Sequence, residues 1–160
     1  MLASPLEDLK RVGCSAELAE VIRRGPALNV RHRIDRQVKL VEWLDIHVIT
    51  LTDPLYPKRL KAIPDPPPLL YYTGALHEQD GMALAIVGGR SATTAGKAIT
   101  EEIARELARG GWTIVSGMAR GIDAAAHRGA LAGQGRTIAV LGCGVDQTYP
   151  PEHDQLRMEI

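Results

Sequence analysis

The chain has 160 residues, 45% of them hydrophobic, and its 19 lysine and arginine residues balance 19 aspartate and glutamate residues. This composition is sufficient for a folded core and excludes a disordered chain, while a net charge of zero does not indicate any class of partner. No apolar stretch approaches the ~20 residues that a membrane-spanning helix needs. The two cysteines, Cys14 and Cys143, are far apart and no signal-peptide pattern is present, which favours a cytoplasmic protein over a disulfide-linked scaffold.

The first 45 residues predict a small helical domain. Ser4, Pro5 and Glu7 form a capping box at the start of a first helix, which would end at Gly13. A second helix is predicted over 16–24 with its end at Gly25. A third is predicted from an apolar stripe made of Ile34, Val38, Val41, Trp43 and Leu44.

Residues 46–81 combine strand and turn signals. The runs VITL (48–51) and LLYY (69–72) predict strands, and the segments DPLYP and PDPPP between them predict turns because proline is not tolerated inside a helix. We expect both strands to join or flank the sheet that follows.

From Met82 onward, short apolar strands alternate with amphipathic helices. Strands are predicted at 83–87, 112–116 and 137–141, and helices at 97–111 and 123–133. The first of these helices places Ile99, Ile103 and Leu107 on one apolar face. Such alternation is typical of an α/β domain, here residues 46–160, with a parallel sheet covered by helices on both faces.

Each of the three strands is followed by glycine, at Gly88 and Gly89, at Gly117, and at Gly142 and Gly144. The carboxyl ends of parallel strands form the edge at which α/β proteins bind ligands, and glycine lets the backbone approach an anion. The alternative is that these turns need glycine only for their backbone conformation. The loops lack the acidic residue of a dinucleotide site, and Ala98 replaces the hydroxyl that a P-loop uses to hold Mg²⁺, so NAD and ATP sites are both disfavoured.

Basic side chains accompany these glycines. Arg90 follows the first strand and Arg120 follows the second, so neighbouring loops could bring both guanidinium groups to one phosphate track. Lys97 is predicted to open the next helix, where a positive charge opposes the helix dipole unless an anion is bound. The sequence therefore predicts a phosphate-binding site made of Gly88, Gly89, Arg90, Lys97, Ser116, Gly117, Arg120 and Gly121.

Other residues could carry chemistry but have simpler explanations. Asp123 and His127 lie one helical turn apart, as an acid–base or metal pair would, yet two ligands do not make a zinc site. We interpret Asp123 as a helix N-cap and His127 as a packing or hydrogen-bonding residue. Cys143 is interpreted as a small residue at a strand end, and Asp146 and Tyr149 as residues that fix a loop. No catalytic residue, metal or cofactor is predicted.

The motifs VGGR, SGMARGIDAAAHRGAL and IAVLGCGVDQTYPPEH resemble the DNA-processing protein A (DprA/Smf) family, densely over 86–153. The resemblance implies a Rossmann-like domain that binds single-stranded DNA and hands it to the RecA recombinase during natural transformation, without catalysis. It matches Gly88, Gly89 and Arg90 to the family's first phosphate-gripping motif, and the segment from Ser116 to Asp123 to its second. It also implies that residues 1–45 form a sterile-alpha-motif-like (SAM-like) domain and that the full-length protein forms a homodimer.

The sequence departs from the family pattern at two places. Gly89 stands where the family usually has serine, and Ala95 stands where an aromatic residue is common. The chain also stops inside the family's Rossmann-like domain, before its later basic residues and its dimer and RecA surfaces. The alternative is a LOG-like nucleotide phosphoribohydrolase, whose Pro-Gly-Gly-x-Gly-Thr motif does not occur in these residues.

Overall fold

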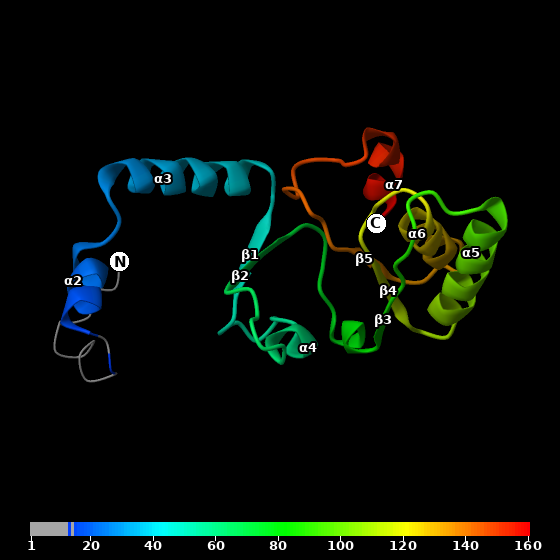
Figure 1. Ribbon diagram of the computed structural model, residues 1–160, viewed down its shortest axis with the longest axis horizontal. Helices are drawn as coiled ribbons and strands as arrows, with labels where there is room; N and C mark the ends of the chain where they lie inside the picture. The colour runs from blue at the N-terminus through cyan, green and yellow to red at the C-terminus, as the bar shows by residue number, and fades with distance from the viewer. Residues whose placement is uncertain (1–12, 14) are drawn as a thin grey trace. The chain divides into compact units, whose positions relative to one another are not determined.

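The computed structural model describes residue 13 and residues 15–160 (Figure 1). The helix predicted from Ser4 to Gly13 falls almost entirely outside these residues. The chain divides into two compact units, 1–45 and 46–160. No helix of the described residues is long and apolar enough to cross a membrane.

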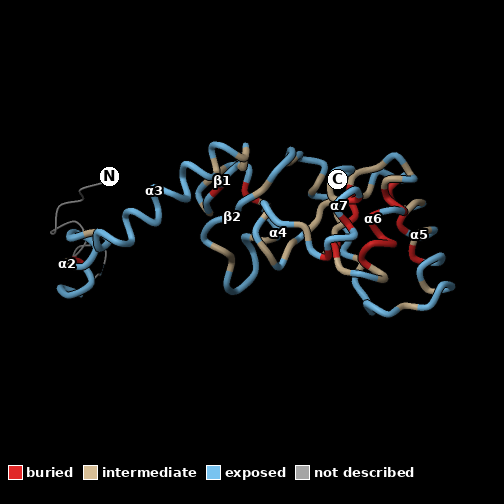
Figure 2. The backbone as a smooth tube through the Cα atoms, turned by 90° about the horizontal axis from the view of Figure 1, so that it is seen from above, coloured by how far each residue is buried: buried red, intermediate tan, exposed pale blue. Residues whose placement is uncertain are grey.

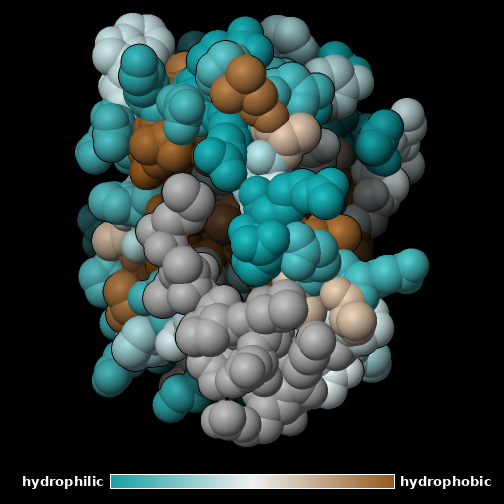
Figure 3. Space-filling view, turned by 90° about the vertical axis from the view of Figure 1, so that its left-hand side faces the viewer, coloured by the Kyte–Doolittle hydropathy of each residue, from teal (hydrophilic) through white to brown (hydrophobic). Residues whose placement is uncertain are grey.

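The first unit contains α2 (Ala16–Arg24) and α3 (Leu28–Trp43), which confirms two of the predicted helices. Ser15 is the N-cap of α2 and accepts a hydrogen bond from the Leu18 amide at 3.2 Å, and Gly25 ends the helix with a φ of 68°. None of the residues of α3 is buried. Figure 3 shows hydrophobic side chains at the surface of the molecule among hydrophilic ones. The SAM-like character of this unit stays a prediction.

The second unit begins with an antiparallel pair of strands, β1 (His47–Thr50) and β2 (Leu69–Tyr72), with the short helix α4 (Lys58–Lys61) between them. Both strands were expected from the sequence. Among the described strands they hydrogen-bond only to each other, so they do not join the parallel sheet. The turn-rich segment between β1 and β2 is held together by Tyr56, which is 2% exposed and donates its hydroxyl proton to the Pro67 carbonyl at 2.7 Å.

The parallel sheet consists of β3 (Ala83–Ala85), β4 (Thr113–Ser116) and β5 (Thr137–Ala139), in the order β3-β4-β5. Helix α5 (Thr94–Arg109) connects β3 to β4, and α6 (Ile122–Ala132) connects β4 to β5. A short 3-10 helix, η1 (Glu78–Gly81), precedes β3, while η2 (Pro151–His153) and α7 (Asp154–Glu159) follow β5. The predicted α/β class with a parallel sheet is confirmed.

Helices α5 and α6 lie together on one face of this sheet. Their side chains surround Ile114 of β4 in a core that also contains Ala104, Ala108, Ala126 and Ala130, and Figure 2 shows the buried residues concentrated in this region. Because the three strands follow one another in order, two right-handed crossovers place both helices on the same side. On the opposite face, Ala85 is exposed and Val140 is 62% exposed. Among the described residues, helices therefore cover one face of this sheet, and the prediction that helices cover both faces is wrong for this part of the chain.

The buried side of α5 differs from the prediction. Ile99 and Ile103 are 61% and 50% exposed, whereas Thr100, Ala104 and Ala108 are buried. The reason is the close approach of α6: a Cβ atom added at Gly129 would lie 2.3 Å from the Glu101 carbonyl oxygen. Only small side chains fit between helices at this separation, so Ile99 and Ile103 of the predicted apolar face do not pack into the core. Leu107 does pack against the core.

The amino edge of the parallel sheet is fixed by Asp80. Its carboxylate accepts hydrogen bonds from Arg136 Nε at 2.8 Å, from the Thr113 hydroxyl at 2.9 Å and from the His77 amide at 2.8 Å. Desolvation by burial raises the pKa of Asp80, but these hydrogen bonds together outweigh it and the pKa is lowered. This cluster ties η1 to the starts of β4 and β5, at the edge opposite the glycine-rich loops.

Candidate functional site

Three loops meet at the carboxyl edge of the parallel sheet. The first loop, residues 87–93, connects β3 to α5; the second loop, 117–121, connects β4 to α6; and the third loop, 140–150, connects β5 to η2. Parallel neighbours bring these loops to the same edge. What the sequence could not show is whether their side chains approach one another.

Gly121 joins the first loop to the second. It has a φ of +82°, and a Cβ atom at this position would lie 2.2 Å from the Gly89 carbonyl oxygen and 2.7 Å from that of Arg90. The Ile122 amide also donates a hydrogen bond to the Gly89 carbonyl at 3.3 Å. The two predicted arginine-bearing loops are therefore in direct backbone contact.

Arg90 and Lys97 are both exposed. Within the described part of the chain, no side-chain hydrogen bond or ion pair holds either of them. Helix α5 begins three residues earlier than predicted: Thr93 is its N-cap and accepts a hydrogen bond from the Gly96 amide at 3.1 Å. Lys97 is thus the fourth residue of α5 rather than the residue that opens it, and it still lies in the first helical turn, beside the first loop.

Arg120 has a protein partner. Its Nε donates to Glu152 Oε1, and its Nη2 donates to Glu152 Oε2 at 3.0 Å, which makes a bidentate ion pair between the second loop and η2. Both side chains are about half exposed, at 54% and 51%. The hydrogen bond from Arg120 is the main cause that lowers the pKa of Glu152 to about 2. Glu152 was not predicted as a site residue, although its position after the third strand placed it at the correct edge.

The second loop is also tied to η2 through His153. This side chain is 6% exposed, and its Nδ1 donates to the Met118 carbonyl at 2.9 Å. Met118 itself is buried and has a φ of +61°, a conformation that is rare for a residue with a side chain. The buried contact with His153 therefore supports an uncommon backbone shape beside Arg120.

Several predicted site residues serve internal contacts. Ser116 is 2% exposed and donates its hydroxyl proton to the Ile86 carbonyl at 2.6 Å. This hydrogen bond joins the end of β4 to the residue that follows β3. A Cβ at Gly88 would lie 2.8 Å from the Ile122 side chain, and one at Gly117 would lie 2.7 Å from Asp123 Oδ2. Gly89 is different, because nothing lies within 4 Å of its added Cβ. Gly89 is exposed, although its carbonyl accepts the hydrogen bond from the Ile122 amide.

Asp123 and His127 do not form an acid–base pair with each other. Gly121, not Asp123, is the N-cap of α6, so the N-cap interpretation is wrong; the Asp123 carboxylate instead accepts a hydrogen bond from the Ala119 amide at 3.3 Å. His127 is fully buried, and its Nδ1 lies 2.7 Å from the Thr137 hydroxyl, which donates to the Ile114 carbonyl. Nδ1 must then be the donor, and burial lowers the pKa of His127 to about 4. The hydrogen-bonding role of His127 is confirmed.

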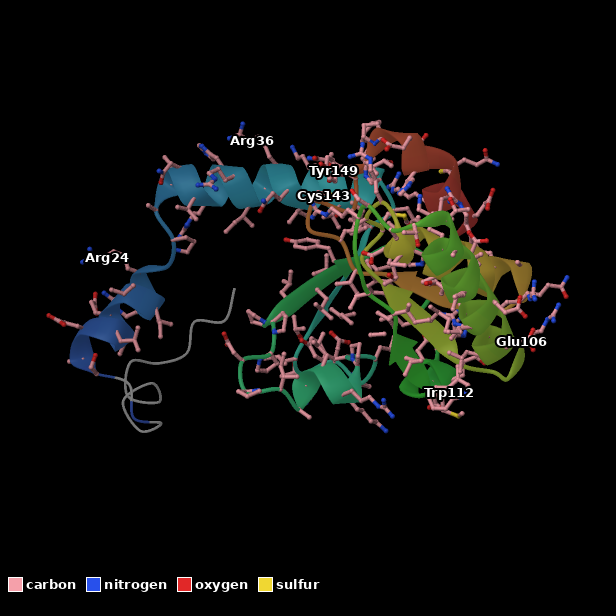
Figure 4. The ribbon with its side chains drawn as sticks, turned by 45° about the vertical axis from the view of Figure 1, so that its right-hand side comes forward. Arg24, Arg36, Glu106, Trp112, Cys143 and Tyr149 are labelled. Atoms are coloured by element: carbon pink, nitrogen blue, oxygen red, sulfur yellow. The ribbon has the colours of Figure 1, made fainter. Side chains whose placement is uncertain are left out.

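The third loop presents Cys143 and Tyr149 at this edge, and Trp112 lies at the opposite one (Figure 4). Cys143 is half-buried, with its Sγ 3.7 Å from the Gln147 carbonyl. Among the described residues, no three histidine, cysteine, aspartate or glutamate side chains gather where they could hold a metal ion.

The comparisons with known proteins agree with this architecture. Residues 47–160 match the family described as DNA recombination-mediator protein A. Because this match includes most of the chain, the chain belongs to the DNA recombination-mediator protein A family. The predicted resemblance to DprA/Smf proteins is thereby confirmed.

Individual relatives cover different shares of the chain. Protein Smf from Synechocystis sp. is 47% identical over 116 residues, which are 70% of this chain and 29% of that protein. The crystal structure of DNA processing protein A from Streptococcus pneumoniae is 31% identical with a TM-score of 0.71, covering 97% of this chain and 52% of that one. A structure of DNA processing protein A from Helicobacter pylori, described for its single-stranded DNA binding mode, is 34% identical with a TM-score of 0.59 over 71% of this chain and 51% of that one. The chain thus spans about half or less of these relatives.

Proposed function

We propose that this chain binds single-stranded DNA without sequence preference, through the phosphate backbone. The observation that carries this proposal is the backbone contact of Gly121 with Gly89 and Arg90, which holds the arginine-bearing first and second loops together. Arg90 and Lys97 are exposed there, and Gly89 between the strand and Arg90 is exposed as well. Guanidinium groups suit phosphate oxygens because their donors form a planar fork.

The exposure of these side chains favours a polymer over a small nucleotide. Arg120 is 54% exposed, and the first loop that carries Arg90 is exposed from Val87 to Ser91. Small-molecule sites bury most of their ligand, whereas a single strand can lie across an open edge and contact several loops. The Helicobacter pylori relative, described for its single-stranded DNA binding mode, supports the same choice.

The test is fluorescence polarisation of a labelled oligo-dT with the wild type, Arg90→Ala, Arg120→Ala and the double variant. Removal of one arginine–phosphate hydrogen bond should weaken binding about tenfold or more, since hydrogen bonds to charged groups contribute about 1.5–3 kcal/mol. The slope of log K against log salt should become shallower by ~0.7 for each phosphate that is no longer bound. Arg109→Ala is the matched control, because it removes one arginine from the last turn of α5, at the opposite edge of the sheet.

Two outcomes would contradict this assignment. One is a double variant that binds oligo-dT as tightly as the wild type does. The other is an Arg109→Ala variant whose affinity falls as much as that of the loop variants, because binding would then depend on total charge rather than on these loops.

We further propose that the chain acts in DNA uptake by natural transformation in the cytoplasm, that the full-length protein is a homodimer, and that it delivers single strands to RecA without catalysing a reaction. These proposals rest on the family membership and on the resemblance of the loop motifs. The LOG-like alternative predicts release of free base from AMP. We expect none with the wild type, and release that stops in Arg90→Ala would instead favour the enzyme.

A further inference from the structure

Tyr149 is an exposed aromatic side chain at the carboxyl edge of the sheet. Its side chain is 59% exposed, although the next residue, Pro150, is fully buried. Of the other aromatic residues of the second unit, Tyr56 is in the core, Tyr71 and Tyr72 are on β2, and Trp112 precedes β4. Tyr149 is therefore the one aromatic residue in the three loops that follow the parallel strands, and Figure 4 shows it away from Trp112.

The loop that carries Tyr149 is held in place by α7. Arg157 Nη2 donates to the Val145 carbonyl at 2.6 Å, and the Thr148 hydroxyl donates to the Asp154 carboxylate at 2.8 Å. The exposure of Tyr149 is thus a property of a fixed loop. An aromatic ring that is presented to solvent by a fixed backbone loses little conformational entropy when a ligand stacks on it.

Tyr149 also lies next to a phosphate-binding candidate. Tyr149 stands three positions before Glu152, whose carboxylate forms the bidentate ion pair with Arg120. The pKa of Arg120 is raised, chiefly by its hydrogen bonds and charge interaction with Glu152, and Tyr149 adds a smaller effect of the same sign. Glu152 uses Nε and Nη2 of the guanidinium group. The guanidinium group is 54% exposed and can still meet a phosphate, and the exposed ring of Tyr149 presents a face to a base.

We propose that Tyr149 stacks on a nucleobase of the strand whose phosphate Arg120 binds. This inference rests on the proposed function and adds a base-contacting position to it. Stacking on an aromatic side chain is tolerant of base identity because every base has a flat π-face. In a duplex these faces are covered by neighbouring base pairs, so Tyr149 would favour single strands over double strands.

The experiment compares two labelled ligands of equal length, oligo-dT and an abasic oligomer with the same phosphates. Binding is measured by fluorescence polarisation for the wild type, Tyr149→Phe, Tyr149→Leu and Tyr149→Ala. Tyr71→Ala is the matched control, since Tyr71 is 47% exposed and lies on β2, in the antiparallel pair. Arg120→Ala reports on the phosphate contact.

We expect Tyr149→Ala and Tyr149→Leu to weaken oligo-dT binding by about fivefold to a hundredfold, the range for removal of one base stack. Tyr149→Phe should bind like the wild type because the ring is retained. The abasic oligomer should bind all four proteins equally, while Arg120→Ala should weaken both ligands and Tyr71→Ala neither.

Three results would overturn the inference. Equal oligo-dT affinity for the wild type and Tyr149→Ala would show that Tyr149 makes no base contact, and it would not affect the assignment of the arginine site. An equal decrease in affinity for oligo-dT and the abasic oligomer would show that Tyr149 acts on the phosphate contact instead. Failure of the wild type to bind either ligand would overturn both this inference and the proposed function.

Discussion

Gly121 is the residue on which the contact between the first and second loops depends. Its substitution by alanine adds one methyl group at a backbone conformation with φ +82° and ψ −121°. That conformation is unfavourable for a residue with a side chain by about 1–3 kcal/mol. The new Cβ would also lie 2.2 Å from the Gly89 carbonyl oxygen, and this neighbour belongs to the backbone and cannot rotate away.

The two effects set the expected decrease in stability. Overpacking of a tight contact costs about 1–3 kcal/mol, so together with backbone strain Gly121→Ala should lower the free energy of unfolding by about 2–6 kcal/mol. The loops should also separate, which predicts a lower affinity for oligo-dT. Urea denaturation followed by circular dichroism measures the stability, and polarisation of labelled oligo-dT measures the affinity.

Two neighbouring glycines supply matched controls. Gly89→Ala adds the same methyl group where nothing lies within 4 Å, so the free energy of unfolding should change by less than ~0.5 kcal/mol. Gly88→Ala should be intermediate, because its Cβ would meet the Ile122 side chain at 2.8 Å rather than backbone. If Gly121→Ala proves as stable as Gly89→Ala, the loops are not packed as described, and the geometric basis of the site is wrong.

Two further predictions test the packing of the parallel sheet. Asp80→Asn should lower the free energy of unfolding by about 1–3 kcal/mol at pH 7, because it weakens charged hydrogen bonds to Arg136. The folded-state pKa of Asp80 is below its ordinary value of 3.8, so this contribution is complete above pH 3.8 and declines as the pH falls through the folded-state value. The free energies of unfolding of wild type and variant, measured by urea titration, should therefore converge at acid pH. A difference between them that grows at acid pH would contradict the assignment. On α5, Ala104→Leu should lower the free energy of unfolding by about 1–3 kcal/mol through overpacking, whereas Ile103→Gln, on the exposed side, should change it by less than ~0.5 kcal/mol. The opposite order in thermal unfolding would show that Ile103, rather than Ala104, faces the core.

Local sequence patterns were sufficient to predict the helices, the strands and the fold class. The apolar runs of β3, β4 and β5 and the helical periodicity between them predicted a parallel sheet because each pattern is read within one segment. The same holds for α2, whose predicted range and glycine end at Gly25 were read from one short segment. The motifs around Arg90 and Arg120 also placed the chain in its family.

Contacts between distant segments were decided only by the tertiary structure. The buried face of α5 follows from how closely α6 approaches it at Gly129, and helical periodicity alone favoured the larger Ile99 and Ile103. Ser116 was predicted as a residue of the phosphate-binding site, and the structure shows that its hydroxyl donates its proton across the sheet to the Ile86 carbonyl. Arg120 and Glu152 are 32 positions apart in the chain, and no local pattern couples them. The sequence by itself determined which residue types reach the carboxyl edge of the sheet, and the packing of one loop against another decided which of their atoms remain free for a ligand.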